Sequence, residues 1–356
     1  MNSRQRVFST ARGEKTDCFP VTPYNGNFAI TAAGYDMSLC QRDGRLLAEA
    51  QQRAWELVGQ DAVVAQSDQY YLAEALGVKT EFRPFSLPVS KGPALESLEE
   101  ASKLRVPDPY TDGRMYVYIE AVGLLRQHFG DGVAVRAPGA GPFALAGHML
   151  GIDNFITTLS VAELEEDEDT IARILDMMEI LYESHYRYVE ACVIAGADIV
   201  QCADSLASLD MISPALYEKY AFPYEKRFFE RIARLKGRYE FLTLLHICGN
   251  NTPVLRKLAE TGCDILEVDY KVDLGLYKKE IGSRVCLMGN INPAGAIFSG
   301  TPDEVAAEAE AAMDAAGAGG RFFLGSGCEV AVKAPAENVR RLVEVGHRRA
   351  PWAELV

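Results

Sequence analysis

The sequence has little positive charge. Its 36 Lys and Arg residues stand against 50 Asp and Glu residues, which gives a formal net charge of -14 and a pI near 5.0. A protein that binds nucleic acid neutralises phosphates with a basic face, and no cluster of Lys and Arg residues that could form one is present. We therefore expect no nucleic-acid partner.

Long apolar runs and a secretory leader are also missing. The chain has no stretch of about 18 apolar residues that could span a membrane, and residues 1–17 lack an apolar segment followed by a cleavage site. These absences predict a cytoplasmic protein without a membrane contact. The 8 cysteines are too sparse for a disulfide scaffold, so we expect packing thiols or metal ligands.

Two nucleotide-binding patterns do not occur either. Neither G-x-G-x-x-G after a strand nor G-x-x-x-x-G-K-[ST] is present, so a nucleotide cofactor is not expected. What the sequence does have is the composition of an ordinary globular protein, with 48% hydrophobic and 24% charged residues. Its 356 residues are enough for a barrel of about 250 residues with insertions.

Short apolar runs bounded by turn residues alternate with helical patterns along the chain, which is typical of repeated βα units. Strands are expected at 18–23, 62–68, 133–138, 197–204, 241–248, 264–269, 285–290 and 321–327. Helices are expected at 44–58, 169–195, 214–235, 252–260, 302–316 and 335–347. This pattern predicts an α/β fold in which residues 1–356 form a single (β/α)8 TIM barrel. Residues 1–17 would be an N-terminal extension, and the proline-dotted segment 78–112 would be an irregular excursion that we interpret as a lid.

The sharpest functional pattern lies at two of the predicted strand ends. His246 and Cys248 close the fifth strand and, being two residues apart, point to the same side. Cys328 follows the eighth strand, and the ends of all barrel strands open on one mouth. One imidazole and two thiolates with a fourth position free are typical of catalytic zinc. On these residues alone, the alternative is that His246 bonds a backbone carbonyl while the two cysteines only pack.

Other polar residues close the neighbouring strands. Glu267 is a candidate fourth metal ligand, with Asp269 beside it as a second candidate. Candidate pocket residues at the strand ends are Asn25, Asp68, Asp204 and Asn292. For the two aspartates, helix capping or another strand-end role is an equal alternative.

Several segments resemble a known family. They are HICGNNTPVL (246–255), MGNINP (288–293), GSGCEVAVKAP (325–335), SDQYYLAEALGV (67–78), GPFALAGHML (141–150) and the stretch 203–224. The sequence resembles the uroporphyrinogen decarboxylase superfamily over nearly its whole length. Within it, the H-x-C motif and the distant Cys are similar to the branch of zinc-dependent corrinoid methyltransferases, which includes methylcobalamin:coenzyme M methyltransferases. The resemblance implies zinc held by His246, Cys248 and Cys328.

Departures from the decarboxylases agree with this branch. Their arginine-rich segment, which holds the acidic side chains of a tetrapyrrole, corresponds here to TPYNGNF (22–28). The loop that carries a histidine there corresponds to 325–327, and His148 stands where a pocket tyrosine is expected, so we add His148 to the pocket candidates.

The resemblance implies an enzyme that moves a methyl group. The group would pass from a corrinoid to a small thiol such as coenzyme M, or from a methoxy or methylthio donor to the corrinoid. No D-x-H-x-x-G corrinoid-binding pattern occurs, so cobalamin is expected on a partner protein. The alternatives are a metal-free lyase like uroporphyrinogen decarboxylase and a non-catalytic zinc- or corrinoid-binding subunit; a homodimer is compatible with each.

Overall fold

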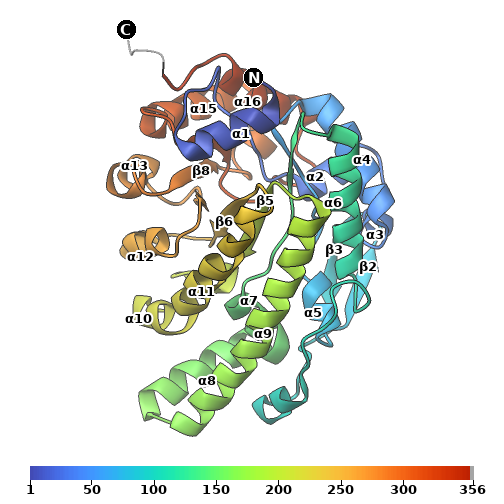
Figure 1. Cartoon of the computed structure of the whole chain (residues 1–356), viewed down its shortest axis with the longest axis vertical. Coiled ribbons are helices and arrows are strands. Elements are labelled where there is room, and N and C mark those ends of the chain that lie inside the picture. The colour runs from blue at the N-terminus through green and yellow to red at the C-terminus, as the bar shows by residue number, and fades with distance from the viewer. Residues whose placement is uncertain (353–356) are drawn as a thin grey trace.

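The computed structural model describes residues 1–352 and shows a parallel sheet surrounded by helices (Figure 1). Its 7 strands follow one another in chain order and pair in parallel. They are β1 (Ala62–Val64), β4 (Ala134–Arg136), β5 (Ile199–Ala203), β6 (Leu242–His246), β7 (Ile265–Glu267), β8 (Cys286–Ile291) and β9 (Phe322–Ser326). Six lie within a predicted strand segment and are shorter than it, and β8 is shifted by one residue from the predicted 285–290, so the later seven of those predictions are confirmed with adjusted bounds.

The first predicted strand, 18–23, is not a regular strand, but it closes the barrel. Val21 forms a single parallel bridge with Leu324 of β9. On the other side, the N–H of Asp61, the residue before β1, donates to the carbonyl of Val21 at 2.8 Å. Within this segment, Pro20 and Pro23 flank Val21 and Thr22. Neither proline has an N–H to donate, which keeps the ladder of hydrogen bonds short. The predicted (β/α)8 barrel is therefore confirmed.

Helices cover the outside of the sheet (Figure 1). The longer ones are α4 (Gly44–Val58), α6 (Met115–Phe129), α8 (Ile152–Glu165), α9 (Glu168–Ala195), α11 (Phe222–Ile232), α13 (Leu274–Ile281), α15 (Pro302–Ala316) and α16 (Ala336–His347). The shorter ones are α2 (Gly26–Ala32), α3 (Met37–Cys40), α5 (Tyr71–Ala75), α7 (Pro142–Leu150), α10 (Pro214–Leu216), α12 (Leu255–Glu260) and α14 (Ala296–Ser299). No helix within residues 1–352 is both long enough and apolar enough to cross a membrane.

Local sequence signals explain where the main helices begin and end. The Asp43 carboxylate accepts the first free N–H groups of α4, and Gly59 ends that helix with a φ of 79°. Thr301 and Glu304 form a reciprocal capping box at the start of α15. The predicted helix 214–235 is instead divided into α10, a π-helical turn at Tyr217–Ala221 and α11. Pro223 lacks the N–H that a continuous α-helix would need there.

The N-terminal extension is a helix that closes the bottom of the barrel. In α1 (Ser3–Arg12), Val7 and Phe8 pack in one buried cluster with side chains of the barrel strands. Arg6 donates to the carboxylates of Asp17 at 2.8 Å and of the fully buried Asp61 at 2.5 Å. Asp61 also accepts the N–H of Val21 at 2.7 Å. These contacts attach the N-terminal helix to the segment around Val21, which closes the barrel.

Removing the charge of Arg6 should weaken the fold. In an Arg6→Met variant the buried Asp61 keeps only the Val21 N–H and the His347 ring at 2.8 Å, so we expect a loss of about 2 kcal/mol of unfolding free energy. Chemical denaturation measures it. Arg12→Met is the matched control, because the Arg12–Glu240 pair is half-exposed and should contribute less than about 1 kcal/mol. Equal losses in the two variants would contradict the prediction.

The segment 78–112 is less irregular than expected. It contains an antiparallel hairpin outside the barrel, β2 (Thr80–Arg83) and β3 (Ser86–Ser90), followed by a 3-10 turn at Leu98–Lys103. Pro84 and Pro88 interrupt the pattern, so the sequence does not show the alternation of a strand pair.

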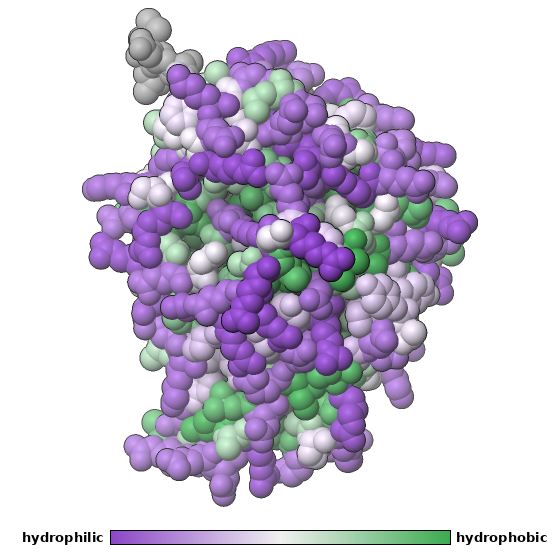
Figure 2. Space-filling model, viewed as in Figure 1, coloured by the Kyte–Doolittle hydropathy of each residue, from purple (hydrophilic) through white to green (hydrophobic). Residues whose placement is uncertain are grey.

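The face of the molecule seen in Figure 2 is mainly hydrophilic, with hydrophobic residues in small separate groups.

Candidate metal centre and pocket

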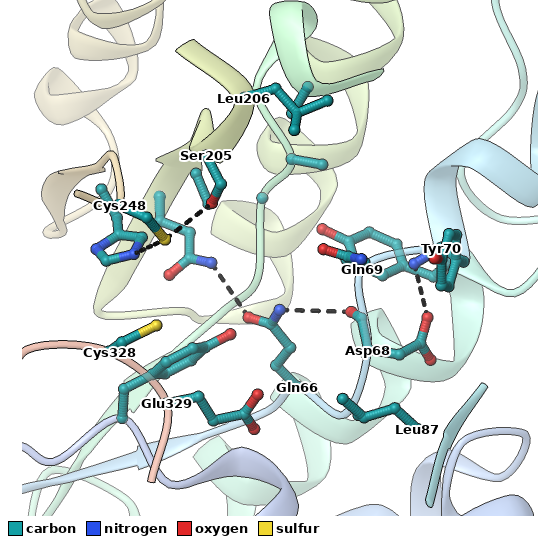
Figure 3. Close-up of a pocket in the computed structure, with 18 of the residues that line it drawn as sticks. Gln66, Asp68, Gln69, Tyr70, Leu87, Ser205, Leu206, Cys248, Cys328 and Glu329 are labelled. Atoms are coloured by element: carbon teal, nitrogen blue, oxygen red, sulfur yellow. Dashed lines mark hydrogen bonds between the residues drawn. The ribbon is translucent and has the colours of Figure 1, made fainter. Parts of the chain in front are cut away.

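The carboxyl ends of the strands open into a cavity of about 470 Å³. Its polar lining comes from strands far apart in the sequence. Gln66 and Asp68 follow β1, Arg136 ends β4, Gln201 belongs to β5, His246 ends β6, Glu267 ends β7, and Cys328 and Glu329 follow β9. Figure 3 shows part of this lining, with the labelled cysteines together at one end of the pocket. The cavity therefore lies where barrel enzymes place their active sites.

Three metal-binding side chains meet in this cavity. One ligand atom each from His246, Cys248 and Cys328 lies within 4.8 Å of the other two. Nε2 of His246 is 3.2 Å from Sγ of Cys248. An imidazole nitrogen and two sulfurs at these separations can converge on a tetrahedral ion, whose bonds to nitrogen and sulfur are about 2.0–2.3 Å long. The residues present therefore fit zinc.

The surroundings favour a thiolate in this cluster. A hydrogen bond from Cys328 and the charge of His246 outweigh burial and lower the pKa of Cys248 to about 3. That same hydrogen bond, together with burial, raises the pKa of Cys328. Burial opposes the positive charge of His246, yet the neighbouring Cys248 sulfur raises the pKa of the imidazole above its usual value. A thiolate is the form of cysteine that binds a metal.

A buried ion pair lies behind the imidazole. Nδ1 of His246 is 3.2 Å from Oε2 of Glu267. Arg136 donates to both oxygens of that carboxylate, at 2.6 and 2.8 Å. Burial would raise the pKa of Glu267, but the Arg136 guanidinium holds it well below its usual range. Glu267 thus lies at the nitrogen that faces away from the Cys248 sulfur, where it can orient the ring.

This position differs from the one expected for a fourth ligand. Glu267 does not join the group whose ligand atoms lie within 4.8 Å of one another, because its oxygens are held by Arg136. Asp269 is also engaged elsewhere, since its carboxylate accepts the N–H of Gly249 at 2.8 Å. Among the described residues, neither of these two carboxylates therefore supplies a fourth ligand atom to the group.

Two of the five pocket candidates line the cavity, Asp68 and His148. The Asp68 carboxylate is held by Arg114 at 2.8 Å and by the hydroxyl of Tyr118 at 2.5 Å. Burial lowers the pKa of His148 to about 4, which leaves a neutral ring next to Tyr70, with ring centres 5.1 Å apart. Both residues therefore contribute to the pocket without a free charge.

The other three candidates lie outside the lining. The Asp204 carboxylate accepts the N–H groups of Phe143 and Ala144 at the start of α7. Oδ1 of Asn292 accepts the N–H groups of Ala294 and Gly295 and so forms a tight turn. Asn25 is fully buried, and its side-chain amide has no hydrogen-bond partner among residues 1–352. We correct these three expectations: Asp204 and Asn292 hold the backbone, and Asn25 is a core residue.

Several pocket residues were missing from the sequence prediction. Gln201 is a polar residue inside an otherwise apolar strand, and this contrast is the signal that could have identified it; Arg136, by contrast, is recognisable from the sequence as a polar residue at a predicted strand end. Glu329 directly follows Cys328 and accepts two hydrogen bonds from Asn27, from its N–H at 3.0 Å and its side-chain amide at 2.6 Å. Burial raises the pKa of Glu329 to about 7. The ring of Tyr24 covers the guanidinium of Arg136 at 4.6 Å.

His148 should make the protein sensitive to mild acid. Its pKa is about 4 in the fold against 6.5 for a free side chain, so only the unfolded chain takes up a proton as the pH falls through this window. Stability due to the neutral ring is present above about pH 6.5 and is lost below it. Relative to the native protein, a His148→Phe variant should gain about 2 kcal/mol between about pH 7 and pH 5. Denaturation curves at both pH values test this, and a constant difference would contradict it.

Comparison with known proteins places the chain in a family. The sequence model described as uroporphyrinogen decarboxylase (URO-D) matches residues 2–349. The chain belongs to the uroporphyrinogen decarboxylase family. Within this family it is 30% identical over 350 residues to a methylcobamide:CoM methyltransferase, MtaA, of Methanosarcina barkeri, with 96% of each chain covered. A uroporphyrinogen decarboxylase of Coxiella burnetii is 26% identical over 285 residues, which covers 80% of this chain and 76% of that protein.

Solved structures agree with the family assignment. A structure described as a methyltransferase from Methanosarcina mazei superposes with a TM-score of 0.85 at 25% identity, covering 98% of this chain and 99% of that one. A B12-independent methionine synthase from Shewanella has a TM-score of 0.57 at 15% identity, covering 86% of each chain. The second likeness shows the shared barrel fold alone.

Proposed function

We propose that this chain is a zinc-dependent methyltransferase that moves a methyl group between a corrinoid on a separate protein and a small thiol or methylated donor. The observation that carries the proposal is the convergence of His246, Cys248 and Cys328 within 4.8 Å beside a cavity of about 470 Å³. The similarity to methylcobamide:CoM methyltransferases over 96% of both chains supports the same activity.

The chemical task is to make a sulfur nucleophile at neutral pH, since a free thiol has a pKa near 8.5. Zinc supplies coordination that removes the thiol proton. Cys248 and Cys328 provide two negative sulfurs that balance the ion's charge, so a third sulfur stays electron-rich. Glu267 holds the ring of His246 so that Nε2 faces the sulfurs.

The proposed transfer step conserves atoms and electrons. The thiolate sulfur attacks the methyl carbon carried on Co(III), and a C–S bond forms as the Co–C bond breaks. The electron pair of the broken bond stays on cobalt as Co(I), and the thiol proton goes to solvent. In the opposite direction the corrinoid would accept the methyl group of a methoxy or methylthio donor. A metal held by His246, Cys248 and Cys328 would supply the positive charge that favours departure of the oxygen or sulfur anion, which takes a proton from solvent.

The activity test uses the purified chain with zinc, free methylcobalamin and a series of thiols. We expect the absorption spectrum of Co(I) to appear together with the methyl thioether, detected by mass spectrometry, and we expect both to vanish when a chelator has removed the metal. Conversion of uroporphyrinogen to coproporphyrinogen without metal would instead support the decarboxylase alternative. In a cobalt-substituted protein, a metal spectrum that no thiol or donor alters would support a non-catalytic subunit.

The pocket also bears on the decarboxylase alternative. A tetrapyrrole with many carboxylates needs several cations, but the only arginine in the cavity lining is Arg136, which is paired with Glu267. This distribution of charge favours methyl transfer.

We also propose that residues 1–356 form one domain and that the hairpin β2–β3 acts as a lid, because Leu87 and Pro88 of β3 line the cavity. The corrinoid protein would dock at this mouth.

A further inference from the structure

We infer that the small molecule activated at this centre is uncharged and largely apolar, with no sulfonate, carboxylate or phosphate group. The inference rests on the proposed function, because it concerns the substrate of the same site. It separates this chain from its methylcobamide:CoM methyltransferase relatives, since coenzyme M is a thiol that carries a sulfonate.

The first argument is the absence of a free cation. Among residues 1–352, the cavity-lining side chains that can carry positive charge are Arg136, His148 and His246. His246 belongs to the metal group. Burial keeps His148 neutral at physiological pH. No lysine lines the cavity, so a bound anion would depend on Arg136.

Three of the five N–H groups of Arg136 are already engaged, and its charge is paired. Its two terminal nitrogens donate to Glu267 at 2.6 and 2.8 Å, and its Nε donates to Oε1 of Gln201 at 2.9 Å. The ring of Tyr24 lies over the guanidinium. An anionic substrate would meet a guanidinium whose charge is already balanced by Glu267, and drawing that charge away would leave the buried carboxylate of Glu267 unpaired.

The second argument is the negative charge already present. Three acidic side chains line the cavity, Asp68, Glu267 and Glu329. Arg114 neutralises Asp68 and Arg136 neutralises Glu267. Glu329 has only the amide groups of Asn27 as partners and forms no salt bridge within residues 1–352. Whether ionised or protonated, Glu329 adds no positive charge. A sulfonate in this cavity would lose its hydration without a compensating unpaired cation among the described residues.

The third argument is the character of the remaining walls. Apolar side chains line much of the cavity, among them Leu87, Ile152 and Leu206, and Figure 3 shows Leu206 and Leu87 on opposite sides of the drawn pocket. Gln201 and Gln66 are joined by a hydrogen bond of 3.1 Å and offer amides to a neutral oxygen. A cavity of about 470 Å³ lies within the range of about 300–1,000 Å³ typical of pockets for drug-sized ligands. These walls fit a small, neutral and largely apolar molecule.

The test compares two thiols of nearly equal size that differ in charge, 2-mercaptoethanesulfonate and 2-(methylsulfonyl)ethanethiol. Each is titrated at about pH 7 into the full chain loaded with Co²⁺, and binding is followed by the absorption of the cobalt–thiolate bond. We expect the neutral thiol to bind at least about 10-fold more tightly. Equal or tighter binding of the sulfonate would overturn the inference while leaving the proposed function intact. If cobalt binds but neither these thiols nor a methoxy or methylthio donor alters its spectrum, the proposed function fails and the inference with it.

A charge introduced at the rim provides the second test. Ile152 lines the cavity and is 37% exposed, so a lysine can be placed there without being buried. Ile152→Lys should bind the sulfonate about 10-fold more tightly than Ile152→Met does, while the two variants should bind the neutral thiol within about 3-fold of each other. Ile152→Met is the control of similar length without charge. If the sulfonate binds equally to the Lys and Met variants, missing positive charge is not what excludes anions, and the inference is overturned.

Discussion

Replacing Cys328 with alanine should leave a folded protein that holds less than one tenth of its zinc and transfers methyl groups at least about 1,000-fold more slowly. The variant removes one of three ligand atoms that lie within 4.8 Å of each other. The binding free energy of zinc at protein sites is about 10–16 kcal/mol when four ligands share it. The loss of one thiolate should therefore cost several kcal/mol, and about 4 kcal/mol corresponds to 1,000-fold. Metal analysis after dialysis and the Co(I) assay measure the two effects.

The matched control is Cys263→Ala. Cys263 is a buried thiol outside the metal-binding group, so its variant should keep one zinc per chain and near-native activity. Cys328 is itself only partly buried, so its truncation should leave the unfolding transition within about 1 kcal/mol of the native one when both proteins are metal-free. If Cys328→Ala retained a full equivalent of zinc under these conditions, the proposed metal centre would have to be abandoned.

The convergence of the three ligands was predictable because it depends on regular geometry. Two residues that alternate on one strand point to the same side, and the strands of a barrel end at one mouth. His246 ends β6 and Cys248 lies two residues beyond that end, so the first rule applies only to His246. Sγ of Cys248 nevertheless lies 3.2 Å from Nε2 of His246, and Cys328 meets them through the second rule. The boundaries of α4 and α15 were predictable for a similar reason, since Asp43 and Thr301 cap their helices through local contacts.

The pocket candidates were harder, because a strand-end position sets only the neighbourhood of a side chain. Asp204 ends a predicted strand, but the free N–H groups at the start of α7 bind its carboxylate outside the cavity lining. Asn292 likewise bonds its own turn. The backbone path after each strand decides between pocket and cap, and residue patterns do not determine that path.

The position of Glu267 shows a second limit, which is the dependence on distant partners. The sequence places it at the strand end beside His246, and β6 pairs with β7 so that His246 and Glu267 are adjacent in register. Which nitrogen of the ring Glu267 faces depends on Arg136, whose guanidinium holds both carboxylate oxygens from a strand three positions away from β7 in the sheet. Sequence spacing contains no information about that contact.

Glu267→Gln should weaken both the fold and the metal centre. The substitution keeps the shape of the side chain but leaves the guanidinium of Arg136, which is 2% exposed, without its negative partner. Removing one member of a buried ion pair costs about 3–5 kcal/mol of unfolding free energy. The imidazole of His246 also loses the carboxylate near its Nδ1, and loss of such a partner lowers metal affinity by about 10–100-fold. Chemical denaturation of the metal-free protein and titration against a zinc chelator measure the two losses separately.

A double variant separates these causes. Adding Arg136→Met to Glu267→Gln removes the unpaired charge, so we expect at least about 2 kcal/mol of stability to return while zinc affinity stays low. Recovery of both quantities together would mean that zinc is lost only through unfolding. Native zinc affinity in a stably folded Glu267→Gln protein would show that the carboxylate does not orient His246. The expected separation follows from the geometry, in which one carboxylate faces a guanidinium on one side and the imidazole on the other.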